Sequence, residues 1–117
     1  MSGLVSYHAG LAAEAAVALH YTRSGREIAA TRWRGSAGEI DLIARDGAAV
    51  IFIEVKQSAT HAQAAEHLTP RQMARIYASA SEFLGGEPGG QNTECRFDVA
   101  LVDEVGRIEI LENAFTA

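Results

Sequence analysis

Residues 39–56 constrain the fold of this chain most, because they have the pattern of two apolar strands joined by the short polar turn Arg45-Asp46-Gly47. Each strand carries an acid where packing favours an aliphatic residue, Asp41 in the first and Glu54 in the second. Lys56 follows two positions after Glu54. A buried charge costs several kcal/mol unless it is paired or holds a metal ion. Three ionisable groups in one hairpin therefore indicate a site rather than ordinary packing.

Side chains alternate along a strand, so Glu54 and Lys56 are expected on the same face. An antiparallel pairing about the turn places Asp41 opposite Phe52 or Ile53, one or two residues from Glu54. A bulge or twist of the strands then brings the two carboxylates within reach of one ion. Two carboxylates and backbone oxygen suit Mg²⁺ or Mn²⁺, which stabilises charge on a phosphate and lowers the pKa of a bound water. Lys56 is placed to orient or deprotonate that water, or to neutralise the phosphate. The hairpin therefore predicts a divalent-metal site for phosphodiester chemistry.

A first helix is predicted over about residues 6–22, and its apolar face is expected to carry Leu11, Ala15, Ala18 and Leu19. Glu14 borders that face. If the helix lies across the sheet, Glu14 can add a metal ligand, directly or through water, or support a second ion. The alternative is an ordinary solvated glutamate.

A second helix is predicted to start at Thr69-Pro70-Arg71-Gln72, which combines an N-cap threonine, proline at the first position and glutamine at the third. An apolar stripe continues to Leu84, and Gly85-Gly86 ends the helix. The opposite face is either solvated or meets phosphates, and it carries Arg71, Gln72, Arg75 and Ser79. The polar stretch 57–68, before this helix, is predicted as a mobile loop with at most one helical turn.

The remaining strands are predicted over 26–34, 96–102 and 107–111. The continuous apolar run in the second hairpin strand is typical of a strand covered on both faces. The strand at 96–102 can pair with that strand in parallel, through a right-handed crossover. Residues 1–117 are thus predicted to form a single α/β domain with a mixed sheet flanked by helices.

The net charge of −5 argues against a protein that coats DNA, although the acidity is concentrated after residue 80. Lys56 is the only lysine among ten cations. The single cysteine, Cys95, excludes an internal disulfide and a cysteine-based zinc site, which fits a reducing cytoplasm. No basic start precedes the apolar N-terminus and no long apolar run occurs, so neither a secretory signal nor a membrane span is expected.

Several segments together resemble the PD-(D/E)XK nuclease superfamily and, more closely, the small bacterial family UPF0102, also called YraN-like. The resemblance covers most of the chain and is carried by Gly10 and Glu14, Gly38-Glu39-Ile40-Asp41-Leu42-Ile43, Phe52-Ile53-Glu54-Val55-Lys56, Thr69-Pro70-Arg71-Gln72 and Arg96-Phe97-Asp98-Val99. It implies a restriction-endonuclease-like fold, with an α-β-β-β-α-β core and a central mixed sheet flanked by helices. It also implies similarity to archaeal Holliday junction resolvases.

The resemblance implies a Mg²⁺- or Mn²⁺-dependent endonuclease that acts on DNA, branched or single-stranded, with Asp41, Glu54 and Lys56 as its catalytic core. Asp41, Glu54 and Glu14 are the expected metal ligands. The expected auxiliary or nucleic-acid-binding positions are Glu39, Gln57, Arg71 and Arg75. A homodimer is compatible by analogy with nucleases that cut both strands.

Two features of the sequence keep other interpretations open. Gln57-Ser58 stands where the family usually has Thr-Arg, and the chain is acidic. Both favour the alternative of a catalytically weak or inactive nucleic-acid-binding or adaptor module with the nuclease fold. The simplest alternative is a paired charge network without chemistry. A small-molecule enzyme is disfavoured, because the sequence has neither a phosphate-binding glycine loop nor a nucleophile elbow.

Overall fold

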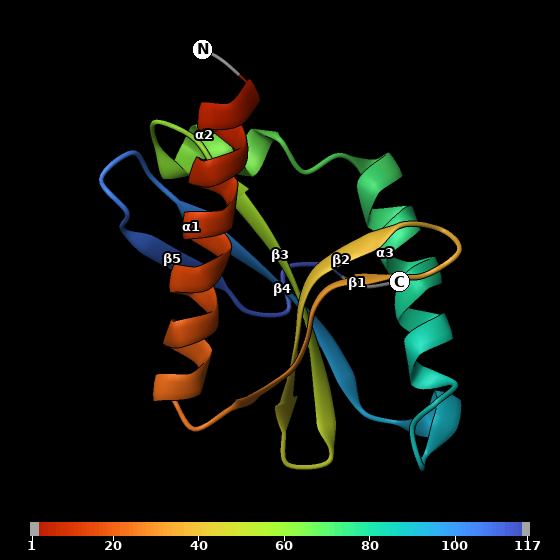
Figure 1. Cartoon of the computed structure of the whole chain (residues 1–117). Helices are drawn as coiled ribbons and strands as arrows, with labels where there is room; N and C mark the ends of the chain where they lie inside the picture. Colours follow the sequence, from red (N-terminus) through yellow and green to blue (C-terminus); the bar gives the residue numbers. More distant parts are fainter. Residues whose placement is uncertain (1–2, 116–117) are drawn as a thin grey trace.

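The computed structural model describes residues 3–115, with side chains from residue 8 onward. The elements in chain order are α1 Gly3–Arg23, β1 Glu27–Arg34, β2 Glu39–Asp46, β3 Ala49–Gln57, α2 His61–Glu66, α3 Pro70–Leu84, the short 3₁₀ helix η1 Gly90–Asn92, β4 Cys95–Val102 and β5 Ile108–Leu111. The five strands form one sheet in the order β1-β2-β3-β4-β5. Helices α1 and α3 flank this sheet on opposite sides (Figure 1).

The sheet is mixed, as the sequence predicted. Strand β3 pairs with β4 in parallel, and the other neighbouring pairs are antiparallel. Helix α3 lies in the connection between the two parallel strands, as a crossover requires. The chain contains the expected α-β-β-β-α-β core, with α2 and η1 inserted between β3 and β4 and with β5 added after β4. This core and the flanked mixed sheet are compatible with the restriction-endonuclease-like fold that the resemblance implied.

Each face of the sheet has its own hydrophobic core. On the α1 side, the helix buries Ala13, Val17 and Tyr21 against residues that include Leu42, Ile51, Ile53 and Ala100. On the α3 side, the helix buries Ile76, Ala80 and Leu84 against residues that include Ile43, Phe52, Phe97 and Val99. Strand β3 contributes to both cores, which confirms that its apolar run is covered on two faces.

The buried face of α1 differs from the predicted one. Ala13, Val17 and Tyr21 are buried, whereas Leu19 is 47% exposed. An alanine-rich helix has little periodicity of its own, so the large Tyr21 side chain, buried against Asp98, decides which face packs. The helix ends as expected at Gly25 (φ +88°), where the Arg26 N–H donates to the Tyr21 carbonyl at 3.0 Å. Among the helices described, none is both long and apolar enough to cross a membrane.

The stretch 57–68 is more ordered than predicted, because it contains the six-residue helix α2. Thr60 caps this helix by accepting a hydrogen bond from the Gln63 N–H at 3.1 Å, and Ala64 is fully buried. One buried alanine is too weak a signal to predict a helix from sequence. The predicted start of α3 is confirmed, since Thr69 and Gln72 form a reciprocal capping box.

Candidate active site

The candidate site lies where β2 and β3 part. These strands pair from Asp46 with Ala49 up to Leu42 with Ile53, and the next residues are Asp41 and Glu54. Beyond this point β2 stays paired with β1, while β3 continues along β4 to Gln57. The β1–β2 hairpin bends away from β3 toward α3 (Figure 1). The sheet therefore forks, and both predicted acids stand at the base of the fork.

The predicted register of the β2–β3 hairpin was wrong by one or two residues. The turn residues are Gly47, with φ +60°, and Ala48, rather than Asp46 and Gly47. Leu42 consequently pairs with Ile53. Continued by one residue, this register sets Asp41 directly across from Glu54, rather than opposite Phe52 or Ile53. The two acids meet without the extra bulge that the sequence argument required.

Strand β2 changes face at Asp41. Ile40 packs in the α3-side core and Leu42 in the α1-side core. In a regular strand, residues two apart share a face, so the backbone turns over at the residue between them. This reversal accompanies the bend of the hairpin and leaves Asp41 at the junction of the two faces.

Strand β1 turns over beside it. Thr31 borders a cavity with α1, whereas Trp33 makes an edge-to-face contact with Phe83 of α3, with ring centroids 5.4 Å apart. The intervening Arg32 has φ +46°, in the left-handed region that favours glycine or asparagine. Arg32 thus lies next to Asp41 in the sheet and has an unusual backbone conformation.

The carboxylate of Asp41 is fixed by the backbone of β3. Its Oδ2 accepts a hydrogen bond from the Val55 N–H at 2.8 Å. This N–H belongs to the edge of β3 that the departing β2 leaves uncovered, and a buried N–H needs an acceptor. The contact sets the Asp41 carboxylate beside Glu54.

Glu54 occupies an environment that disfavours its charge. Burial and its hydrogen bond with Asp41 raise the pKa of Glu54 to about 9, although the charge of Lys56 lowers it. Its register neighbour on β4 is Val99, which packs in the α3-side core, so Glu54 lies on the α3 face. Lys56 is two residues on and lies on the same face, as predicted. Two acids in contact share a proton or need a cation between them.

Glu14 approaches the fork from α1. Burial and the nearby charge of Asp41 raise the pKa of Glu14, while Arg32 lowers it. Its Oε1 lies 3.2 Å from Nη1 of Arg32, and the two form an ion pair. Glu14 is therefore close to the site but engaged by an arginine that the sequence argument had not singled out.

The other predicted site residues fall into two groups, those that line a cavity with Glu54 and those that do not. Glu39 and Arg75 line a cavity of about 180 Å³ with Glu54, together with Gly38, Gln72 and Ile76. Glu39 also forms an exposed ion pair with Arg34 at 3.3 Å. Gln57, at the end of β3, and Arg71, in the first turn of α3, are exposed and line no part of this cavity. The structure thus brings Glu39 and Arg75 to Glu54, but not Gln57 or Arg71.

The donor set fits a divalent ion held by two carboxylates. Within the part of the chain that the structure describes, no group of three His, Cys, Asp or Glu side chains is arranged to hold a metal. Asp41 and Glu54 nevertheless supply adjacent oxygen donors of the kind that Mg²⁺ and Mn²⁺ prefer. Their contact would be relieved by a cation. Glu14 would have to leave Arg32 to join them.

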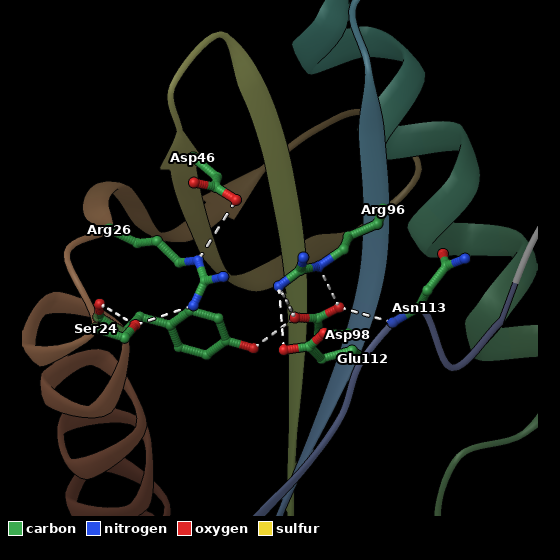
Figure 2. Close-up of polar contacts among 8 residues, drawn as sticks. Ser24, Arg26, Asp46, Arg96, Asp98, Glu112 and Asn113 are labelled. Carbon is green, nitrogen blue, oxygen red and sulfur yellow. Dashed lines mark hydrogen bonds and ion pairs between the residues drawn. The ribbon is translucent and has the colours of Figure 1, made fainter.

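A second buried acid forms a different cluster, shown in Figure 2. Asp98 on β4 is fully buried. It accepts hydrogen bonds from the Tyr21 hydroxyl (2.8 Å), from Arg96 Nε and Nη2 (3.0 and 3.2 Å) and from the Asn113 N–H (2.9 Å). Glu112 lies 3.8 Å from Arg96. The sequence marked Arg96 and Asp98 only as part of the resemblance, and the structure shows that they join α1, β4 and the segment after β5.

Known proteins match this chain over the segment that holds the candidate site. The model of the uncharacterised protein family UPF0102 matches residues 13–102, which include every candidate site residue. A UPF0102 protein of Cereibacter sphaeroides is 70% identical over 117 residues, covering 100% of both chains. One from Ruegeria pomeroyi is 58% identical and covers 97% of this chain and 92% of its own. One from Roseobacter denitrificans is 49% identical, covering 98% and 89%.

Proposed function

The chain belongs to the family UPF0102, and from this premise we propose that it is a Mg²⁺- or Mn²⁺-dependent endonuclease that hydrolyses phosphodiester bonds of DNA. The observation that carries the proposal is the contact between the carboxyl groups of Asp41 and Glu54 at the fork of the sheet. A strongly shifted acid in an open site is characteristic of catalytic and metal-binding positions. Lys56 lies on the same face, within electrostatic reach of Glu54.

Asp41, Glu54 and Lys56 each have a separate role in the proposed catalysis. Asp41 and Glu54 would hold the ion, which when bound supplies Lewis acidity toward a phosphate oxygen and lowers the pKa of a water. The Val55 N–H keeps the Asp41 carboxylate in place before any ligand arrives. The ammonium group of Lys56 orients the attacking water or neutralises charge that develops on the phosphate.

The charge distribution supports a polyanionic substrate. Half of the ten cations belong to segments around the fork, namely Arg32, Arg34, Lys56, Arg71 and Arg75, and the acids at or near the fork include Glu14, Glu39, Asp41 and Glu54. Most acids of the C-terminal third belong to other segments, such as the β4–β5 turn with Asp103 and Glu104. Phosphate contacts from such arginines supply most of the affinity for nucleic acid.

The cavity beside Glu54 favours an unpaired nucleotide. Its volume of about 180 Å³ is small, and it is lined by the polar or charged residues Gln72, Arg75, Glu39 and Glu54 and by the apolar Ile76. Enzymes that take a nucleotide out of a duplex hold a single base in such a pocket through polar edges and apolar contacts. This supports branched or single-stranded DNA as the substrate.

We also propose that the protein acts in the cytoplasm. It would act as a two-fold dimer, because a branched substrate requires two paired cuts. Cys95, the single cysteine, is a free thiol, which fits a reducing compartment. Sedimentation of the protein with and without junction DNA tests the dimer. A species that stays monomeric on a cleaved four-way junction would contradict it.

The direct test is a cleavage assay on labelled single-stranded, forked and four-way-junction DNA, with continuous duplex as the comparison. Cleavage is expected in Mg²⁺ or Mn²⁺ and not with a chelator. Asp41→Asn and Lys56→Ala should each lower the rate by at least about 100-fold. The matched control is Asp46→Asn, at the exposed end of the same strand, which should leave the rate unchanged. Cleavage by purified Asp41→Asn protein at the wild-type rate would overturn the proposal.

A second candidate is a nucleic-acid-binding adaptor without catalysis. The observation that favours it is that two further acids near the fork, Glu14 and Glu39, are already paired with Arg32 and Arg34. Such a module would bind DNA in a salt-dependent manner and show no turnover in any divalent ion. Absence of DNA binding at low salt would remove this candidate.

A further inference from the structure

We propose that Arg32 is a phosphate-binding residue whose guanidinium is kept from phosphate by its ion pair with Glu14 in the metal-free protein. If the Glu14 carboxylate left Arg32 to hold a divalent ion together with Asp41 and Glu54, the Arg32 guanidinium would become available to a phosphate of the nucleic acid. The inference rests on the proposed function and deepens it, because it links metal binding to substrate binding through one ion pair.

The backbone of Arg32 is the first observation. Among the described residues, two that are not glycine have positive φ, Arg32 (+46°) and Asn113 (+48°). Asparagine tolerates the left-handed region, whereas a long side chain such as arginine does so at the expense of strain. Strained residues of this kind concentrate at functional sites. The unusual backbone of Arg32 stands beside Asp41, where β1 turns over.

The position of Arg32 is the second observation. Its neighbours Thr31 and Trp33 pair with Leu42 and Ile40, so Arg32 stands beside Asp41 in the sheet. Strand β1 is the outer strand of the sheet on that side. The backbone of Arg32 thus lies between Asp41 and the open edge of the sheet, and its guanidinium contacts Glu14 of α1. A nucleic-acid strand would approach from this edge.

The contact with Glu14 is suited to exchange. It joins Arg32 Nη1 and Glu14 Oε1 at 3.2 Å, and the side chains of Arg32 and Glu14 are 47% and 20% exposed, so water reaches the pair from the arginine side. Exposed ion pairs are weak, because water and salt compete with them. A cavity of about 160 Å³ borders both residues, together with Leu11 and Ala18, and gives Glu14 room to move. A divalent ion beside Asp41 would compete for the same carboxylate.

A static clamp is the alternative role for this pair. Arg32 would then fasten α1 to β1, and its loss would change stability but neither metal affinity nor DNA affinity. An exchange makes the opposite prediction. Removing Arg32 should strengthen metal binding, since Glu14 is released, and weaken DNA binding only when metal is present.

Arg32→Asn separates these roles, because asparagine removes the charge and tolerates the backbone conformation. The control is Arg107→Asn, which removes one exposed arginine in the turn before β5, at the opposite edge of the sheet. Mn²⁺ titration calorimetry on the full chain should show about 2- to 5-fold tighter binding for Arg32→Asn than for wild type. Arg107→Asn should bind Mn²⁺ as wild type does.

DNA binding is then measured against salt concentration, with Lys56→Ala present in every protein to stop turnover. In Mn²⁺, Arg32→Asn should reduce the slope of log K against log salt by about 0.7 to 0.9, the loss of one phosphate contact. In a chelator the slopes should agree. Glu14→Gln provides the complementary test, because it frees Arg32 without metal and should steepen the slope in the chelator by a similar amount.

The outcomes separate the two proposals. If wild type binds Mn²⁺ and Asp41→Asn does not, yet Arg32→Asn and Glu14→Gln change neither Mn²⁺ affinity nor the slopes, the role of Arg32 is overturned and the metal site stands. If wild type binds no Mn²⁺, the proposed function itself fails. Should Arg32→Asn not fold, the Glu14→Gln slope in chelator decides the role of Arg32.

Discussion

Two acids on neighbouring strands differ sharply in how the protein compensates them. Asp98 pairs in register with Ile53, one residue before Glu54, so the two acids are close along the sheet. Asp98 lies on the α1 side, where the Tyr21 hydroxyl, Arg96 and a backbone N–H all donate to it. Glu54 lies on the α3 side, and its side chain shares a hydrogen bond with another acid, Asp41.

The difference shows that burial of an acid does not by itself mark a functional site. Around Asp98 the chain supplies its own donors, as a structural carboxylate requires. Around Glu54 the chain places a second acid, Asp41, and the charge of Lys56 does not offset burial and this contact, so the charged form is disfavoured. A compensating ion from outside the chain would resolve this, and that is the physical basis of the proposed metal site.

The largest expected effect is on the structural side of the comparison. Asp98→Ala should lower the free energy of unfolding by about 3 kcal/mol or more, because Arg96 would remain largely buried without its carboxylate. Urea unfolding at pH 7 measures this. Asp46→Ala, which removes an exposed aspartate 3.7 Å from Arg26, is the control and should change little. Equal stability of the two variants would contradict a structural role for Asp98.

Removing the carboxylate of Glu54 should raise the free energy of unfolding, whereas removing that of Asp98 lowers it. The pKa of Glu54 is about 9 in the folded protein against 4.5 for the free side chain, so folding takes up a proton between these values. The contribution of Glu54 to stability is therefore fully present below about pH 4.5 and is lost as the pH rises toward 9. Glu54→Gln should stabilise the metal-free protein by on the order of 2 kcal/mol at pH 7, because the amide is never charged.

Urea unfolding in chelator from pH 5 to 8 tests this change. The wild-type free energy of unfolding should decline across the range, and that of Glu54→Gln should decline much less. A variant that is less stable than wild type at pH 8 would show that the carboxylate is already compensated within the chain.

A smaller effect is expected from one hydrogen bond of the Asp98 cluster. Tyr21→Phe removes one donor and leaves Arg96 and Asn113, so the loss should be about 1 to 2 kcal/mol. The control is Tyr77→Phe, because the buried Tyr77 hydroxyl has no hydrogen-bond partner in the described structure. Thermal unfolding of both variants compares them. A larger loss from Tyr77→Phe would mean that the described contacts do not govern stability here.

The smallest effect is expected at the exposed rim of the fork. Arg34 is 76% exposed and pairs with Glu39. Arg34→Ala should shift the free energy of unfolding by less than about 0.5 kcal/mol, since exposed ion pairs contribute little. Thermal unfolding in low and high salt measures it. A loss above about 1 kcal/mol would place this pair with the structural cluster instead.

Local signals made most of the fold predictable. The threonine, proline and glutamine at the start of α3, the glycine after α1 and the apolar run of β3 each act within a few residues. The face of α1 was not predictable, because alanines give no direction and the contact of Tyr21 with Asp98 spans 77 residues. The hairpin register depended on where the turn begins, which Asp46-Gly47-Ala48 leaves ambiguous.

The site was predictable only in part for the same reason. Strand alternation and the hairpin bring Asp41, Glu54 and Lys56 together, and the sequence predicted this proximity. The reversal of both strands at Arg32 and Asp41 arises from the bend of the hairpin over α3, which is a tertiary effect. Arg32 therefore had no sequence signal beyond the imperfect alternation of β1.

Mn²⁺ titration calorimetry of wild type and Asp41→Asn at pH 7, in two buffers of different ionisation enthalpy, tests the metal site most directly. Wild type should show a specific site, with nearly one proton released per ion as Glu54 gives up its proton. Asp41→Asn should show no such site, while Asp46→Asn should bind as wild type does. Equal Mn²⁺ binding by wild type and Asp41→Asn, or none by wild type, would contradict a metal site at the fork of β2 and β3.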